Sequence, residues 1–207
     1  MEKVSLIPIT LGFVVDVNSI IFAKVSEQIA QFISLMQQGD KCYYYHPEKF
    51  TAHDKAGALA TVGMIKYRKI DVGEGVCHAM CVLAEEFNRS ELMIFAILDN
   101  PSRSKTNGIL SAMNKDAINH LDTNFVVCTI NPESNQDFEK ISMDYPQYRY
   151  VNVTNTQNMA SVLMEQIHAF VKGYEYFKLW DQNIEKPEEV IEKVEPEEFV
   201  VTGEIDG

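Results

Sequence analysis

The sequence predicts an α/β protein with a three-layer, doubly wound, mostly parallel sheet and helices on both faces. Two observations predict it. Short, almost wholly apolar runs recur at residues 9–17, 91–98 and 124–130, as is typical of strands buried on both faces of a parallel sheet. Segments with apolar residues at steps of three and four alternate with these runs and indicate amphipathic helices. Such alternation favours right-handed crossovers between parallel strands.

The elements are predicted in chain order from these patterns. After the strand at residues 9–17 comes a helix over residues 21–36, and Gly39 stands where that helix would stop. Residues 40–57 are interpreted as an irregular connection and residues 58–67 as the second strand. Three more strands (91–98, 124–130 and 148–153) and four more helices (76–87, 106–121, 136–144 and 159–170) complete the series.

Length and charge predict how the chain is organised. It has 207 residues, 46% of them hydrophobic, which suits one globular domain with an appendage. The formal net charge is −12, and nine acidic residues against two lysines place −7 of it between Asn183 and Gly207. We therefore expect a folded domain over residues 1–175 and an acidic, flexible tail over residues 176–207.

Charge and cysteine use also narrow the classes of partner. An acidic body with an acidic tail repels nucleic acid, so we expect no direct nucleic-acid binding. The basic trio Lys66, Arg68 and Lys69 is interpreted as a solvated strand end. The sequence has no run near the eighteen or so apolar residues of a membrane span, so we expect no membrane contact. Four cysteines in strongly patterned segments indicate a reducing compartment, nuclear or cytoplasmic.

Two aspartates stand at the ends of buried strands. Asp16 closes the first strand, and Asp99 follows the strand over residues 91–98. In parallel sheets of this kind, ligands bind at the carboxyl ends of the strands. We therefore expect Asp16 and Asp99 to lie close together at that edge. We favour an interpretation in which they cap the following helices or accept backbone N–H groups.

This layout resembles the von Willebrand factor A domain. In that family a first strand ending Asp-x-Ser-x-Ser, a threonine and a second aspartate together hold a divalent ion. Here the motif is Asp16-Val17-Asn18-Ser19-Ile20, so Asn18 could supply an oxygen whereas Ile20 cannot. The threonine position falls near Glu74. The resemblance thus implies a degenerate site without a metal cofactor. Mg²⁺ held by Asp16, Asn18, Asp99 and Glu74 is the alternative.

A narrower resemblance concerns the start of the domain. Val14-Val15-Asp16-Val17-Asn18 followed by Ile20-Ile21-Phe22 is similar to the start of the small von Willebrand A subunit of the transcription and DNA-repair factor TFIIH. The similarity extends over about residues 5–172. The proline of that family is Ser19 here, and its zinc module has no counterpart among the four cysteines. The proteasome's ubiquitin receptor, another intracellular A domain with a broken metal site, is the second similar family.

Three consecutive tyrosines are a further candidate site. Tyr43, Tyr44 and Tyr45 lie in the segment interpreted as irregular, and tyrosine is enriched at protein interfaces. They could equally cover the exposed edge of the sheet. Both interpretations place them at the surface of the domain.

Other chemistry has weaker support in the sequence. Cys42, His46, Cys77 and Cys81 could form a zinc site, but their spacing of four lacks the usual tight Cys-x₂-Cys knuckle. The chain has no Gly-x-Ser-x-Gly elbow, no recognisable pairing of a nucleophile with a base, and no glycine-rich phosphate loop. We therefore expect no catalytic residues and no cofactor.

Together these features predict a non-enzymatic scaffold that binds the protein subunits of a larger complex. The resemblance to the TFIIH subunit implies a nuclear transcription and repair complex. The candidate partner-binding residues are Asp16, Asn18, Asp99, Tyr43, Tyr44 and Tyr45. A metal-dependent adhesion or assembly module is the alternative function, and a subunit similar to the proteasome's ubiquitin receptor is another.

Overall fold

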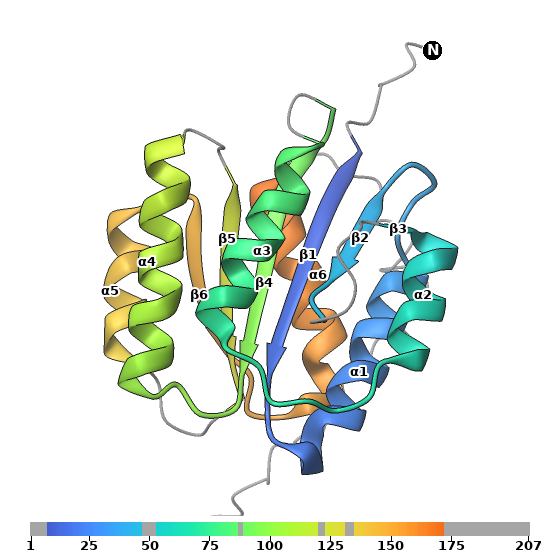
Figure 1. Ribbon diagram of the computed structural model, residues 1–207, viewed down its shortest axis with the longest axis horizontal. Helices are drawn as coiled ribbons and strands as arrows, with labels where there is room; N and C mark the ends of the chain where they lie inside the picture. The colour runs from blue at the N-terminus through green and yellow to red at the C-terminus, as the bar shows by residue number, and fades with distance from the viewer. Residues whose placement is uncertain (1–7, 47–52, 87–88, 120–122, 131–134, 172–207) are drawn as a thin grey trace, which may run out of the picture.

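The computed structural model describes residues 8–46, 53–86, 89–119, 123–130 and 135–171 (Figure 1). Its strands are β1 (Ile9–Asp16), β2 (Lys41–Tyr44), β3 (His53–Asp54), β4 (Glu91–Leu98), β5 (Asn124–Thr129) and β6 (Tyr148–Asn152). Its helices are α1 (Ser19–Ser34), α2 (Lys55–Met64), α3 (Val72–Ala84), α4 (Arg103–Asn119), α5 (Gln136–Asp144) and α6 (Met159–Phe170). A short 3₁₀ turn, η1 (Thr156–Asn158), precedes α6.

The strands form one sheet in the order β3-β2-β1-β4-β5-β6. Neighbouring strands are parallel except β2 and β3, which are antiparallel. This confirms the predicted fold class, a doubly wound and mostly parallel sheet. The chain passes from β1 to β2 on one side and adds β4 on the other side of β1. The strand order therefore reverses at β1 and β4, where the carboxyl ends of parallel strands open a crevice.

Helices cover both faces of the sheet, so the domain has three layers (Figure 1). Helices α1, α2 and α6 contribute to the core on one face. There Phe13 of β1 stacks on Phe95 of β4, with ring centroids 5.3 Å apart, and Phe32 of α1 meets Phe13 edge-on at 5.7 Å. Helices α3, α4 and α5 contribute to the core on the other face, with buried residues such as Ile109 and Phe138. The central strands are thus buried on both sides, as their continuous apolar runs predict.

The prediction of the second strand was wrong. Residues 58–67 belong to α2 and to the connection after it, and the second strand is β2, within the segment interpreted as irregular. Aromatic residues favour strands, and Tyr43 and Tyr44 in β2 are buried. The 58–67 segment begins with alanines, the best helix formers. The buried residues of α2 are Ala58, Thr61 and Val62, which recur at helical spacing.

Helix α3 begins at Val72, earlier than the predicted residue 76. Its N-cap is Asp71, whose carboxylate accepts the backbone N–H of Glu74 at 3.0 Å. Residues 72–75 thus form the first turn of α3, which contains two glycines. A Cβ on Gly75 would lie 2.6 Å from a methyl carbon of Val14 in β1, so this turn packs directly on the sheet.

The other predicted elements agree with the structure. Strand β4 and helices α5 and α6 have the predicted bounds, and α1, α4, β5 and β6 differ from prediction by a few residues at their ends, as element boundaries commonly do. The predicted acidic tail over residues 176–207 lies outside the described residues.

The close approach of α3 to β1 generates a stability prediction. A Cβ on Gly75 would overlap the buried side chain of Val14 and the ring of Tyr45. We predict that Gly75→Ala lowers the free energy of unfolding by about 1–3 kcal/mol, the usual cost of overpacking, as measured by urea denaturation.

The matched control is Gly63→Ala in α2, where an added Cβ meets nothing within 4 Å. That change should stabilise the protein by roughly 0.5 kcal/mol, because alanine has the higher helix propensity. Equal effects of the two substitutions would contradict the packing of α3 on β1.

Candidate functional site

The carboxyl edge of the sheet at β1 and β4 is the candidate site, and we call it the rim. It consists of Asp16, Asn18, Ile20, Asp99 and Lys105. Strands β1 and β4 pair in parallel with Asp16 opposite Leu98, so Asp99 follows directly beside the end of β1. This register brings the two predicted acidic residues to one place, as the sequence analysis expected.

Asp99 is bound by Asn18 rather than capping a helix. Its Oδ2 accepts the backbone N–H of Asn18 at 2.7 Å and the side-chain Nδ2 of Asn18 at 2.6 Å. The Oδ1 of Asn18 in turn accepts the backbone N–H groups of Ile20 and Ile21, at 2.9 and 3.2 Å. Asn18 is therefore the N-cap of α1. The predicted acceptance of a backbone N–H by Asp99 is confirmed, whereas the capping residue is Asn18 and not Asp16.

Asp16 forms an ion pair with a residue that the sequence analysis missed. The Nζ of Lys105, from the first turn of α4, lies 2.9 Å from Oδ2 of Asp16. The side chain of Asp16 is 7% exposed and that of Lys105 is 26% exposed. A carboxylate this buried needs a compensating charge, and Lys105 supplies it. The sequence gives no sign that Lys105 contacts Asp16, because α4 is far from β1 along the chain.

The carboxylate oxygens of the rim already have partners within the chain. Asp16 is paired with the Lys105 ammonium, and the Asp99 oxygen bonds to Asn18. Glu74 is exposed at the start of α3, with its carboxylate 3.7 Å from His78. Ile20 contributes no oxygen. Among the described residues, no group of three or more His, Cys, Asp or Glu is placed to hold a metal. The magnesium site considered from the sequence would need the Asp16 and Asp99 oxygens that Lys105 and Asn18 contact here.

The three tyrosines do not form the exposed surface that was predicted for them. Tyr43, Tyr44 and Tyr45 are 1%, 5% and 6% exposed, respectively. Tyr43 and Tyr44 lie in β2 and Tyr45 follows it, and the three side chains alternate between the two cores of the sheet. Burial raises the pKa of all three phenol groups. Their physical role in the folded chain is packing, so the rim keeps Asp16, Asn18 and Asp99 but not the tyrosines.

The cysteines considered for zinc lie on different faces of the sheet. Cys42 belongs to the core beneath α1, whereas Cys77 packs with α3 against the other core. Burial raises the pKa of the Cys42 thiol, and it raises that of Cys128 to about 12. A thiol with so high a pKa stays protonated at neutral pH and is a poor metal ligand or nucleophile.

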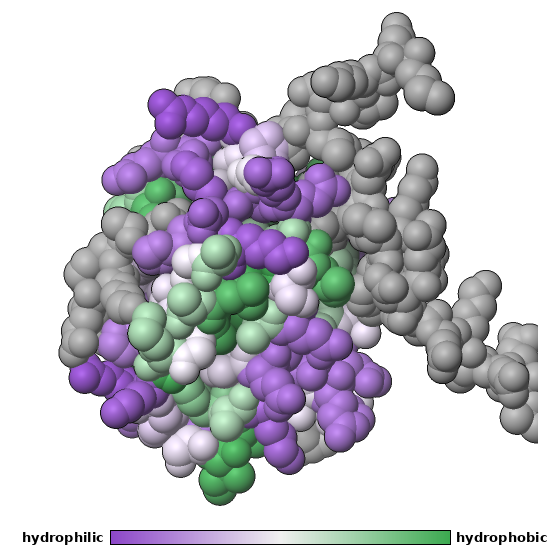
Figure 2. All heavy atoms as spheres, turned by 90° about the vertical axis from the view of Figure 1, so that its right-hand side faces the viewer, coloured by the Kyte–Doolittle hydropathy of each residue, from purple (hydrophilic) through white to green (hydrophobic). Residues whose placement is uncertain are grey.

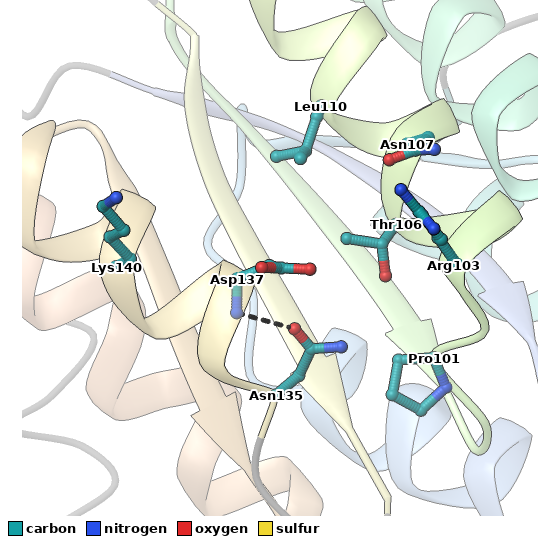
Figure 3. A pocket seen from close by; sticks show the side chains of 8 residues that line it. All are labelled: Pro101, Arg103, Thr106, Asn107, Leu110, Asn135, Asp137 and Lys140. Carbon is teal, nitrogen blue, oxygen red and sulfur yellow. Dashed lines mark hydrogen bonds between the residues drawn. The ribbon is translucent and has the colours of Figure 1, made fainter.

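A polar pocket of 690 Å³ lies beside the rim, between the starts of α4 and α5 (Figure 3). It shares the first turn of α4 with the rim, because Arg103 and Thr106 flank Lys105 in sequence. Figure 3 shows Lys140 and Arg103 on opposite sides of the pocket, with Asp137 between them. Asn135 caps α5 by accepting the backbone N–H of Asp137 at 3.1 Å. The sequence analysis missed this pocket, since its residues come from two separate helices.

Comparison with known proteins identifies the fold. No protein-family model matches the sequence, and no curated protein does. A von Willebrand factor type A structure from Catenulispora acidiphila matches with a TM-score of 0.57 at 12% identity, over 77% of this chain and 41% of that chain. The pilus adhesin SpaC from Lactobacillus rhamnosus GG, in its open conformation, matches with a TM-score of 0.54 at 8% identity, over 78% of this chain and 30% of that one.

These likenesses show that the chain has the von Willebrand factor A fold. The chain spans less than half the length of either of these two structures. In the described part of the chain, no helix is both long and apolar enough to span a membrane.

The ion pair between Asp16 and Lys105 generates a second stability prediction. Lys105→Met leaves the Asp16 carboxylate buried without its cation, and we predict a loss of about 1–3 kcal/mol in the free energy of unfolding. Urea denaturation measures it. Lys24→Met, at an exposed lysine of α1, is the matched control and should change stability by less than about 0.5 kcal/mol.

A double mutant tests whether the loss comes from this pair. In an Asp16→Asn background, Lys105→Met removes no charge partner and should cost much less than in the wild type. Equal losses in both backgrounds would show that Lys105 acts through other contacts.

Proposed function

We propose that this protein is a non-enzymatic protein–protein interaction module whose rim binds another protein without a bridging metal ion. The observation that carries the proposal is the ion pair of Asp16 with Lys105 at 2.9 Å. A divalent cation and the Lys105 ammonium would compete for the same carboxylate oxygen, at a distance where like charges repel strongly. The positive charge at this edge is thus supplied by Lys105 and not by a metal ion.

Exposed groups at the rim and after α2 suit a protein partner. Ile20 is 84% exposed, directly after the Asn18 cap. Tyr67, 41% exposed, packs edge-on against Phe22 with ring centroids 5.7 Å apart. The exposed basic residues Lys66, Arg68 and Lys69 flank that ring in sequence. Apolar side chains beside polar groups and charges are typical of protein interfaces.

A more specific form of the proposal is a subunit of a nuclear transcription and repair complex resembling TFIIH. Its support is the residue pattern of Val14–Asn18 and Ile20–Phe22. In such a complex the chain would act as a scaffold for neighbouring subunits, without catalysis and without direct contact with nucleic acid. A proteasome-associated subunit similar to the ubiquitin receptor is the second choice within this class.

A metal-dependent adhesion or assembly module is the competing proposal. One observation favours it, because one of the structures that shares the fold is a pilus adhesin. In this case Lys105 would have to leave Asp16 so that an ion could join Asp16 to a carboxylate of the partner. The two proposals differ in whether Asp16 binds a divalent ion.

Isothermal titration with Mg²⁺ and with Mn²⁺ separates the two. We predict no saturable binding by the wild-type chain, and no change in thermal stability with a chelator, because Lys105 already neutralises Asp16. Saturable binding that Asp16→Ala abolishes would contradict the proposal and support the metal-dependent module.

Affinity capture with quantitative mass spectrometry tests the rim as the partner surface. We predict that Ile20→Asp removes the proteins that co-purify with the wild-type chain, because it places a charge in an apolar contact. Met143→Asp, at the equally exposed Met143 of α5 (84%), is the matched control and should retain them. If both variants lose the same proteins, or if both retain them, the rim is not the partner surface.

A further inference from the structure

Helix α2 is more apolar than its position in the fold requires. Its sequence from Ala56 to Met64 contains no charged residue, and helices that are apolar on every side are normally buried. Yet α2 packs against α1 and β2 on one side, where Ala58, Thr61 and Val62 are buried. Its other side is exposed and carries Ala56, Ala60, Gly63 and Met64, the last 64% exposed. We call these four residues the outer face of α2.

The outer face continues into a groove. Figure 2 looks onto this side of the molecule and shows a hydrophobic band between hydrophilic areas. The groove has a volume of 440 Å³ and lies between the end of α1 and the start of α2. Met36, Ala56 and Leu59 supply its apolar lining, and Lys55 donates a hydrogen bond to the carbonyl oxygen of Met36 at 3.1 Å at its margin. Its volume suits one or two large side chains.

The chain leaves the described region at the end of α6, on the face of the sheet that also carries α1 and α2. Phe170 and Val171, at the end of α6, pack against the same core as Leu35, the C-cap of α1. Helix α1 contacts both α6 and α2, so it lies between them. Neighbouring helix axes are about 10 Å apart, which places α2 roughly 20 Å from α6. Nine residues of chain span up to about 30 Å, so residues shortly after Val171 can reach α2.

The sequence just after Val171 has the matching composition. Between Tyr174 and Trp180, five of the seven residues are aromatic or apolar, namely Tyr174, Tyr176, Phe177, Leu179 and Trp180. The two charged residues, Glu175 and Lys178, cancel. The strongly acidic part of the chain begins only after Asn183. An aromatic segment without net charge therefore follows Val171 within reach of an uncharged apolar face.

We propose that the segment Tyr174–Trp180 docks in the groove and on the outer face of α2 of its own chain. Attachment through a short connection gives the segment a millimolar effective concentration, which a second copy or a separate partner would have to match. The large aromatic side chains bury the apolar surface, and the small residues Ala56 and Ala60 let them approach the helix closely. The folded domain then extends to Trp180, and the acidic tail begins beyond it.

Fluorescence of Trp180 tests the proposal, because Trp180 is the single tryptophan of the chain. In the full-length protein we expect emission at a shorter wavelength than in urea, together with protection from acrylamide quenching. Met64→Glu and Ala60→Glu, both at exposed positions, should shift the emission to longer wavelength and remove the protection while the far-ultraviolet helix signal is retained. Met143→Glu on α5 is the matched control and should leave both readouts unchanged.

Each other outcome overturns the proposal in a distinct way. Emission and quenching of the wild type equal to those of the unfolded chain would mean that the segment does not dock. Protection that neither α2 variant alters would place Trp180 elsewhere on the domain. Protection that depends on protein concentration, with a dimer in sedimentation velocity, would make a second copy the occupant of the outer face.

Discussion

The parallel pairing of β1 with β4 is the constraint on which the rest of the structure depends. The two strands stay in register from Ile9 opposite Glu91 to Asp16 opposite Leu98, and Phe13 stacks on Phe95 across them. Strands β1 and β4 are each buried on two faces, so a shift of their pairing by one residue would move apolar side chains from one core to the other. The same register fixes Asp16 and Asp99 at one edge of the sheet, and the rim is built around these two side chains.

Two carboxylates at one edge require positive charge or hydrogen-bond donors. In the von Willebrand A domains that the sequence resembles, a divalent ion meets this need and demands several convergent oxygens. Here an ammonium group neutralises Asp16, and Asn18 donates two hydrogen bonds to Asp99. Since an ammonium pairs with one carboxylate and requires no coordination shell, the remaining rim positions need not supply oxygen ligands. An exposed isoleucine at position 20 is compatible with this arrangement and incompatible with a ligand at that position.

The sequence was sufficient for the fold class and for every residue of the rim except Lys105. Continuous apolar runs identified β1, β4 and β5, and carboxylates at two strand ends identified Asp16 and Asp99, because both signals are local. Lys105 could not be predicted, since its contact with Asp16 depends on how α4 crosses the sheet, and its sequence neighbours Ser104 and Thr106 give no hint of a buried partner. The tyrosines were misplaced because an aromatic run describes a buried strand as well as it describes an interface.

The wrong prediction for residues 58–67 and the exposed outer face of α2 have the same physical cause. A helix with one buried side normally carries charges on the other, and α2 carries none between Ala56 and Met64. Without polar positions at helical spacing, the segment lacked the pattern that distinguishes a half-buried helix from a buried strand. Its composition fits a helix that is covered on both sides. On one side α2 packs against α1 and β2. The aromatic segment Tyr174–Trp180 has the composition and the reach to pack against the other side.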